Sequence, residues 1–202
     1  STWWAAPCVD DRRRSSIDVD LQCIVGISWD IVEKLHKRFN NKKQEGNPKL
    51  IISDIDGVLT DSGMYYSEKG DEQKKFNTKD GMAFSLFRDK GLISALITSE
   101  TTKINLNRSK KMNIDYLFQG RKNETKKSAI IEICSREKIS LNDVIYVGDD
   151  INCIDSLTSV GFPFCPNDAV EAVKKIKDIE VLQSKGGEGC IREIYEFFYY
   201  NV

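Results

Sequence analysis

Two aspartates set two positions apart, Asp54 and Asp56, are the residues whose spacing most directly suggests chemistry. They follow the apolar run 50–52, and Gly57 comes directly after them. Since residues i and i+2 of a β-strand point to the same side, both carboxylates are expected to face one spot just beyond a strand end. Two carboxylates held together repel, so they favour a shared divalent cation or a shared proton. One can attack an electrophile while the other gives and takes protons. The alternative is a pair that only caps a turn.

Hydroxyl, lysine and acidic residues occupy three further positions where a strand is predicted to end or a helix to begin. Thr98 and Ser99 follow an apolar strand, where they can bind phosphate at a helix N-terminus or simply cap that helix. Lys126 stands at a predicted helix start, where it can neutralise phosphate charge or belong to a solvated basic surface. Asp149 follows another apolar strand and can complete a metal site begun by the first acid pair. Helix capping by this aspartate is the alternative.

The elements that must position these residues alternate between strand and helix from residue 49 onward. Strands are predicted at 49–55, 92–98, 115–118, 143–147 and near 162–164, and helices at 80–90, 101–112, 125–137, 151–159, 168–176 and 189–199. This order predicts an α/β fold, a three-layer, Rossmann-like and mostly parallel sheet with helices on both faces. In such sheets ligands bind beyond the carboxyl ends of the strands, where the four positions lie. Residues 62–76 read as a β-hairpin inserted directly after the first strand.

The composition excludes some partners. Of 202 residues 30% are charged, and the net charge is −1, so neither nucleic acid nor an anionic membrane surface is an expected partner. No apolar run approaches the roughly 20 residues that span a bilayer. The six cysteines show no CxxC spacing, which favours reduced thiols and a cytoplasmic location. Because His36 is the only histidine and lies outside the main domain, catalysis is expected to use carboxylates, lysine and hydroxyls.

Taken together, the pattern DxDGxxTD at 54–61 and the Gly-Asp-Asp run at 148–150 resemble the haloacid dehalogenase superfamily over residues 49–200. The resemblance implies a phosphotransferase in which Asp54 attacks phosphorus and forms an aspartyl phosphate. It also implies Mg²⁺ held by Asp54, the backbone carbonyl of Asp56, and Asp149.

Further catalytic roles follow from the same resemblance. Asp56 would protonate the leaving oxygen and then activate water. Thr98 and Lys126 would hold the phosphoryl oxygens. These roles agree with phosphoryl transfer in general, which depends mainly on charge neutralisation and positioning.

The short gap between the acid pair and Thr98 leaves no room for a large cap domain. The chain is therefore similar to the capless subgroup that includes 3-deoxy-manno-octulosonate 8-phosphate phosphatase. In that group the hairpin builds a tetramer, so the resemblance implies a homotetramer formed through residues 62–76. The segments that carry Asp80 and Arg192 resemble the group as well, which implies that these residues, with Asn152, contact the substrate.

Glu100 is a departure from the octulosonate phosphatases, which carry Thr-Gly-Arg where this chain has Thr-Ser-Glu at 98–100. A glutamate there, together with Lys111, resembles the 2-keto-3-deoxynononate 9-phosphate phosphatases. A reversed charge is expected to change which part of a sugar acid is tolerated, whereas the alternative is a glutamate that only favours a helix N-terminus. The first interpretation predicts a phosphatase for a nonulosonate, sialic-acid-type 9-phosphate, with Ser99, Glu100 and Lys111 in substrate binding. The eight-carbon acid is the alternative substrate.

Cys153 is a second departure, because these enzymes often carry another aspartate at this position. A thiol is a poor ligand for magnesium, so the substitution raises the question of how strongly the metal is held.

Residues 1–48 are predicted to be a separate, disordered or linker segment before a phosphatase domain at 49–202. A strand at 17–25, a helix at 29–39 and a linker at 40–48 are expected within it. Segments 16–20 and 29–33 resemble the end of the catalytic domain of N-acylneuraminate cytidylyltransferase, whose animal forms carry a phosphatase-like module. This resemblance implies a place in sialic acid biosynthesis and a second possible function, a non-catalytic oligomerisation module of that transferase. The intact Asp54 favours the enzyme.

Overall fold

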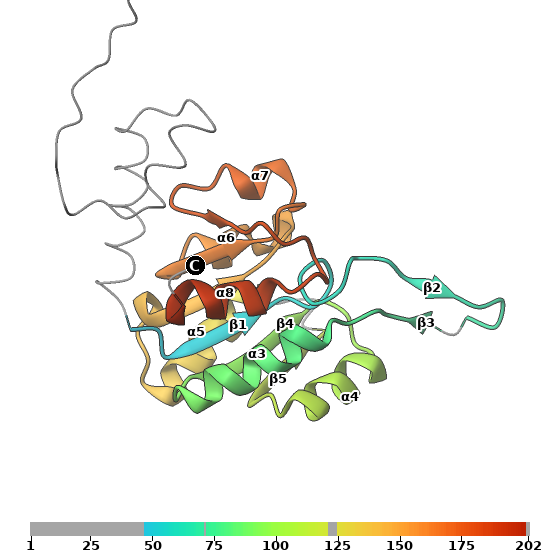
Figure 1. Cartoon of the computed structure of the whole chain (residues 1–202), viewed down its shortest axis with the longest axis horizontal. Helices are drawn as coiled ribbons and strands as arrows, with labels where there is room; N and C mark the ends of the chain where they lie inside the picture. Colours follow the sequence, from blue (N-terminus) through green and yellow to red (C-terminus); the bar gives the residue numbers. More distant parts are fainter. Residues whose placement is uncertain (1–46, 71, 121–124, 201–202) are drawn as a thin grey trace, which may run out of the picture. The chain divides into compact units, whose positions relative to one another are not determined.

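The computed structural model describes residues 47–70, 72–120 and 125–200 (Figure 1). All of them belong to the second of the chain's two units, residues 46–202. The strand, helix and linker predicted before residue 47 lie outside the described residues. The domain boundary predicted at residues 48 and 49 therefore stays a prediction.

A six-stranded sheet forms the centre of the described unit, with the strand order β5-β4-β1-β6-β7-β8. Its strands are β1 (Leu50–Ser53), β4 (Ile93–Thr98), β5 (Tyr116–Gln119), β6 (Val144–Val147), β7 (Phe162–Cys165) and β8 (Glu180–Val181). Every pairing in this sheet is parallel. Ser53 at the end of β1 pairs with Leu96 on one side and Val147 on the other, so three strands end at nearly the same level. This register brings the segments after β1, β4 and β6 to one edge of the sheet.

Helices cover both faces of the sheet, as the sequence predicts. The longer ones are α3 (Thr78–Asp89), α4 (Lys103–Met112), α5 (Lys126–Glu137) and α8 (Cys190–Tyr199), with the short α6 (Ile154–Leu157) and α7 (Glu171–Lys174). Apolar residues of α3, α4 and α8 pack in one buried cluster, and those of α5, α6 and α7 in a second. Ile51 of β1 belongs to the first cluster and its neighbours Leu50 and Ile52 to the second, because side chains alternate across a strand. The predicted three-layer α/β architecture is confirmed.

A hairpin follows β1 and extends away from the sheet on the side toward which β1 runs (Figure 1). It consists of β2 (Tyr65–Tyr66) and β3 (Glu72–Gln73), which pair antiparallel. The predicted insertion at 62–76 is therefore confirmed. Tyr65 and Tyr66 are 61% and 64% exposed in the single chain. Within the described residues only this hairpin and α3 separate β1 from β4, which agrees with the prediction of a capless domain.

Between residues 151 and 181 the helices and strands of the structure differ from the predicted ones. The helix predicted at 168–176 is only the four-residue α7, because Val170 has extended backbone and its N–H donates to the Asp149 carbonyl at 3.0 Å. The predicted helix 151–159 is a 3₁₀ turn (Ile151–Cys153) followed by α6. The strand β8 was not predicted, since two residues are too few to show an alternating pattern.

The glycine-rich segment before α8 packs against the loop that follows β1. The N–H of Gly187 donates to the Val58 carbonyl at 2.9 Å, and Asn77 donates to the carbonyl of Gly187 at 3.2 Å. A Cβ on Gly186 would lie 2.3 Å from the Gly57 oxygen. The segment therefore supports the loop that carries the acid pair.

Within the described residues, no helix combines the length and the apolar character needed to cross a membrane.

Candidate active site

The loop after β1 places the acid pair at the edge of the sheet. Asp54 is buried, its N–H donates to the Val147 carbonyl at 3.0 Å, and its Oδ1 accepts from the N–H of Ile55 at 2.8 Å. The turn that follows requires glycine, because Gly57 has φ +81° and a Cβ there would lie 1.8 Å from Oδ2 of Asp149. The glycine of the motif thus makes room for an acid that arrives from another strand.

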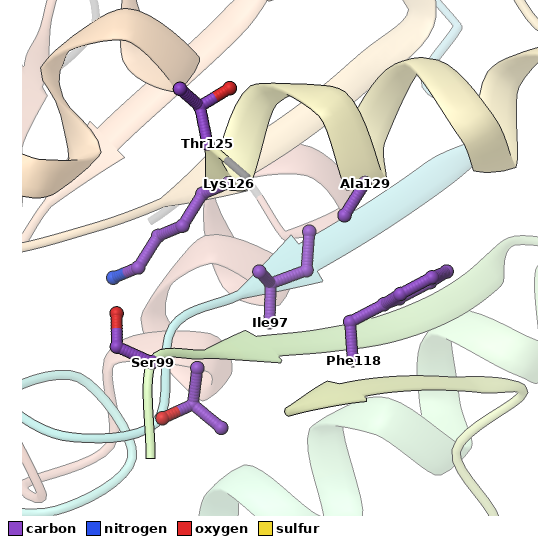
Figure 2. A pocket seen from close by; sticks show the side chains of 7 residues that line it. Ile97, Ser99, Phe118, Thr125, Lys126 and Ala129 are labelled. Atoms are coloured by element: carbon purple, nitrogen blue, oxygen red, sulfur yellow. The ribbon is translucent and has the colours of Figure 1, made fainter. Parts of the chain in front are cut away.

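Lys126 forms a buried ion pair with Asp54. Thr125 caps α5, its side chain accepting from the N–H of Ser128, so that Lys126 begins the helix facing the sheet edge. Figure 2 shows the Lys126 side chain extending from the helix start toward Ser99, which follows β4. Burial is the largest single effect and lowers the pKa of Lys126, but the charges and hydrogen bonds of Asp54 and Cys153 together outweigh it, so the pKa is raised. The lysine is therefore a fixed cation beside the first carboxylate.

A cleft of about 200 Å³ opens where the three strand ends meet. It is lined by Asp54, Asp56, Ser62, Thr98, Ser99, Glu100, Lys126, Asp149, Asp150 and Asn152. Eight of these are residues that the sequence analysis singled out, from four separate stretches of chain. Ser62 and Asp150 are additional. The hydroxyls, the lysine and the acids of the predicted site therefore share one cavity.

Three predicted substrate-binding residues do not line this cleft in the single chain. Asp80 is 1% exposed, and its Oδ1 accepts the N–H groups of Ile191 at 2.9 Å and Arg192 at 3.2 Å. The structure thus gives Asp80 a structural part, holding the N-terminus of α8. Arg192 donates through Nε to Glu196 at 2.6 Å, and Lys111 is exposed on α4. Their assignment to substrate stays a prediction.

Sequence reasoning also missed Lys74, which contacts two of the residues that line the cleft. Its side chain is 1% exposed, its Nζ lies 2.8 Å from Oδ1 of Asp56, and it also contacts Oε2 of Glu100. Oε1 of Glu72 lies 3.6 Å from the same Nζ. Alternation along the returning hairpin strand was a signal that Lys74 and Lys75 point to opposite sides. Nothing in the sequence indicated which side faces the acid pair.

Burial and repulsion from neighbouring carboxylates raise the pKa values of two carboxyl groups in the cleft, those of Asp149 and Asp56. The pKa of Asp149 is raised to about 7, chiefly by burial and then by the Asp54 charge, while Lys126 opposes the shift. The pKa of Asp56 is raised by burial, against the lowering effect of its hydrogen bond with Lys74. A raised pKa favours the protonated form of Asp56, which is the form that a general acid needs.

The donor set fits a hard divalent cation, with one reservation. Ligand atoms of Asp54, Asp149 and Cys153 lie within 4.8 Å of one another, and the two repelling carboxylates are the ligands that such a cation prefers. The Cys153 thiol is buried, 3.2 Å from Oδ2 of Asp54, and burial raises its pKa to about 12. The thiol is therefore protonated at neutral pH and adds no charge to the site.

Chemically, the cleft combines a buried carboxylate paired with lysine, a second carboxyl able to carry a proton, and hydroxyls beside a cationic side chain. This arrangement suits nucleophilic attack by carboxylate on a phosphoryl group.

Residues 66–194 match the family described as haloacid dehalogenase-like hydrolase. The matched segment covers more than half of the chain, and the chain belongs to this family. The predictions of this family and of a hydrolase of phosphoric monoesters are confirmed at this level.

Several of the proteins that the chain is similar to are phosphatases. The 3-deoxy-D-manno-octulosonate 8-phosphate phosphatase of Escherichia coli strain K12 is 30% identical over 172 residues, covering 85% of this chain and 85% of that protein. A probable YrbI family phosphatase from Pseudomonas syringae has a similar structure, with a TM-score of 0.74, 31% identity, and coverage of 80% of this chain and 89% of that one. The octulosonate phosphatase of Moraxella catarrhalis, crystallised with magnesium, phosphate and the sugar acid, gives a TM-score of 0.73 at 26% identity, covering 80% and 90%.

Proposed function

We propose that the protein is a Mg²⁺-dependent phosphatase that releases inorganic phosphate from a nonulosonate 9-phosphate. The observation that carries this proposal is the buried pair of Asp54 and Lys126, which shares one cleft with Asp56 and Asp149. A scaffold without catalysis has no use for buried charges of this kind, whose desolvation is costly.

The residues take the following roles. An Asp54 oxygen bonds to phosphorus as the bond to the leaving oxygen breaks, and Asp56 gives that oxygen a proton. Water then attacks phosphorus, Asp56 takes its proton, and Asp54 is released. Thr98 and Lys126 hold the phosphoryl oxygens during both steps, which lowers the barrier by neutralising charge.

Asp54, the backbone carbonyl of Asp56 and Asp149 would hold Mg²⁺. The ion supplies further neutralisation of phosphate charge when bound. Magnesium in the Moraxella catarrhalis relative supports this choice of ion.

Glu100 supports the nine-carbon substrate. It lines the cleft, where it places a negative charge beside Thr98 and Ser99. Such a group accepts hydrogen bonds from sugar hydroxyls and repels a carboxylate, so it selects which end of a sugar acid can lie there. The relatives named above support the runner-up, 3-deoxy-manno-octulosonate 8-phosphate.

The test is phosphate release from both sugar-acid phosphates in the presence of Mg²⁺, with Asp54→Asn as the control. Faster release from the nonulosonate 9-phosphate that disappears in the variant supports the proposal. Faster release from the octulosonate 8-phosphate makes that acid the substrate. No release from either compound, or from an aryl phosphate, favours the non-catalytic oligomerisation module of N-acylneuraminate cytidylyltransferase.

We also propose a homotetramer formed through the hairpin 62–76. The exposed Met64, Tyr65 and Tyr66 support this, because a two-stranded hairpin with such side chains gains stability from a partner. Sedimentation would report a mass four times that of the chain, and a monomer would refute it. The four free, buried cysteines among the described residues are consistent with the proposed cytoplasmic location.

A further inference from the structure

Lys74 lies among three carboxylates although its side chain is almost fully buried. Its ammonium group is 2.8 Å from Oδ1 of Asp56, contacts Oε2 of Glu100 and is 3.6 Å from Oε1 of Glu72. A buried ammonium is costly unless it is paired, and here it is paired with two residues that line the cleft. Lys74 is not itself among the residues that line the cleft. Its effect on the reaction must therefore pass through its partners.

The neighbouring Lys75 shows what a merely structural lysine does in this hairpin. It points to the opposite side, is largely exposed, and pairs with Asp61 at 3.0 Å on the surface. Either lysine can tie the hairpin strand to the loop after β1. Only Lys74 contacts the two acids to which proton transfer and substrate selection have been assigned.

The contact with Lys74 also determines which oxygen of Asp56 can carry a proton. An ammonium group has donors and no acceptor, so Oδ1 of Asp56 must act as an unprotonated acceptor. The proton of the acid form is then on Oδ2. With Oδ1 held in place, Oδ2 can keep one direction from turnover to turnover.

We propose that Lys74 is a positioning residue, which fixes Oδ2 of Asp56 toward the leaving oxygen and holds Glu100 at a set distance from it. This inference rests on the proposed phosphatase function of the site. During the reaction the proton passes from Oδ2 to the leaving oxygen as the phosphorus–oxygen bond breaks. Lys74 keeps all its protons. Substrate recognition by Glu100 and proton transfer by Asp56 are thus aligned through one side chain.

The test compares Lys74→Met, Lys74→Arg and the matched control Lys75→Met on two substrates. The nonulosonate 9-phosphate has a poor alkoxide leaving group that needs a proton, whereas p-nitrophenyl phosphate has a leaving group that does not. General acids contribute about 10²–10⁴-fold to rate, so Lys74→Met should lower kcat on the sugar phosphate by about 10–100-fold. On the aryl phosphate the loss should stay below about threefold. Lys74→Arg should recover part of the loss, and Lys75→Met should behave as wild type.

The ratio of the two activities is measured within one variant, so partial unfolding of Lys74→Met cancels. Equal losses on both substrates would show that Lys74 only maintains the fold and would overturn the inference while the phosphatase function stands. No loss on either substrate would overturn it as well. A wild-type protein inactive on both substrates would overturn the phosphatase function and, with it, the inference.

Discussion

Replacing Gly57 by alanine should damage the site through a single clash. The new Cβ would lie 1.8 Å from Oδ2 and 2.4 Å from Cγ of Asp149. Since Cβ contacts under 3.0 Å are essentially never seen, either the carboxylate or the loop that carries the acid pair must move by more than 1 Å. The φ of +81° adds backbone strain, because side-chain-bearing residues rarely adopt it.

Two magnitudes follow from this geometry. The left-handed backbone alone costs about 1–2 kcal/mol in the free energy of unfolding. A displacement of about 1 Å in a catalytic group can lower the rate about 100-fold. Gly57→Ala is therefore expected to lose more than 1–2 kcal/mol of stability and about two orders of magnitude in kcat/KM.

Gly91→Ala is the matched control. Gly91 has φ +83°, and a Cβ there meets nothing within 4 Å, so it carries the backbone strain without the clash. Urea unfolding and phosphate release should show a similar backbone cost but near wild-type turnover. In an Asp149→Ala background, Gly57→Ala should cost no more stability than Gly91→Ala. If Gly57→Ala matches Gly91→Ala in both stability and activity, the reasoning about the clash is wrong.

Three further substitutions test buried polar side chains in or near the site. Burial raises the pKa of Asp80 to about 6, although the N–H groups of Arg192 and Ile191 act to lower it. Ionised Asp80 therefore lowers the free energy of unfolding by about 3 kcal/mol. This loss of stability is absent below about pH 4 and complete above pH 6. Asp80→Asn should therefore be the more stable protein at pH 7 in urea unfolding, and the advantage should vanish by pH 4; an advantage independent of pH would contradict this. Lys126→Met leaves Asp54 as an unpaired buried charge, so it should lose about 3–5 kcal/mol in the same assay together with turnover; a loss under about 1 kcal/mol would contradict this. Cys153→Asp should lower the half-saturating Mg²⁺ concentration about 10-fold or more, measured by calorimetry and by activity, and unchanged binding would show that this position does not support the metal.

The strand ends were predictable because two local signals coincide there. Apolar runs such as Leu50–Ile52 are long enough to show a buried strand, and the polar residues after Thr98 and Val147 mark where each run ends. Parallel strands then bring those ends to one edge without any knowledge of distant contacts. Lys126 could not be selected from the sequence pattern alone, because Lys122 and Lys127 lie close to it in the chain, and the family resemblance selected it.

The missed features depend on contacts that no local pattern encodes. Lys74 contacts Asp56, which is 18 residues away in the sequence, and Glu100, which is 26 residues away. Its inward direction depends on how the hairpin is oriented relative to the sheet. Asp80 was assigned to substrate because its segment resembles the octulosonate phosphatase group. The sequence did not indicate that its carboxylate accepts backbone N–H groups more than 100 residues away, at the start of α8. Structural and catalytic acids differ here only in their three-dimensional partners.

Lys126 and Lys74, both buried, distinguish the surroundings of four of the five carboxylates that line the cleft. Lys126 pairs with Asp54, the proposed nucleophile, and places a cation where phosphate charge must be neutralised. Lys74 pairs with Asp56 and Glu100, on the side of the leaving group, and leaves one oxygen of Asp56 to carry the proton. Asp149 has no comparable lysine, and burial beside Asp54 raises its pKa to about 7. Its negative charge is therefore the one that a bound divalent cation would stabilise most, so the roles proposed for Asp54, Asp56 and Asp149 correspond to different partners.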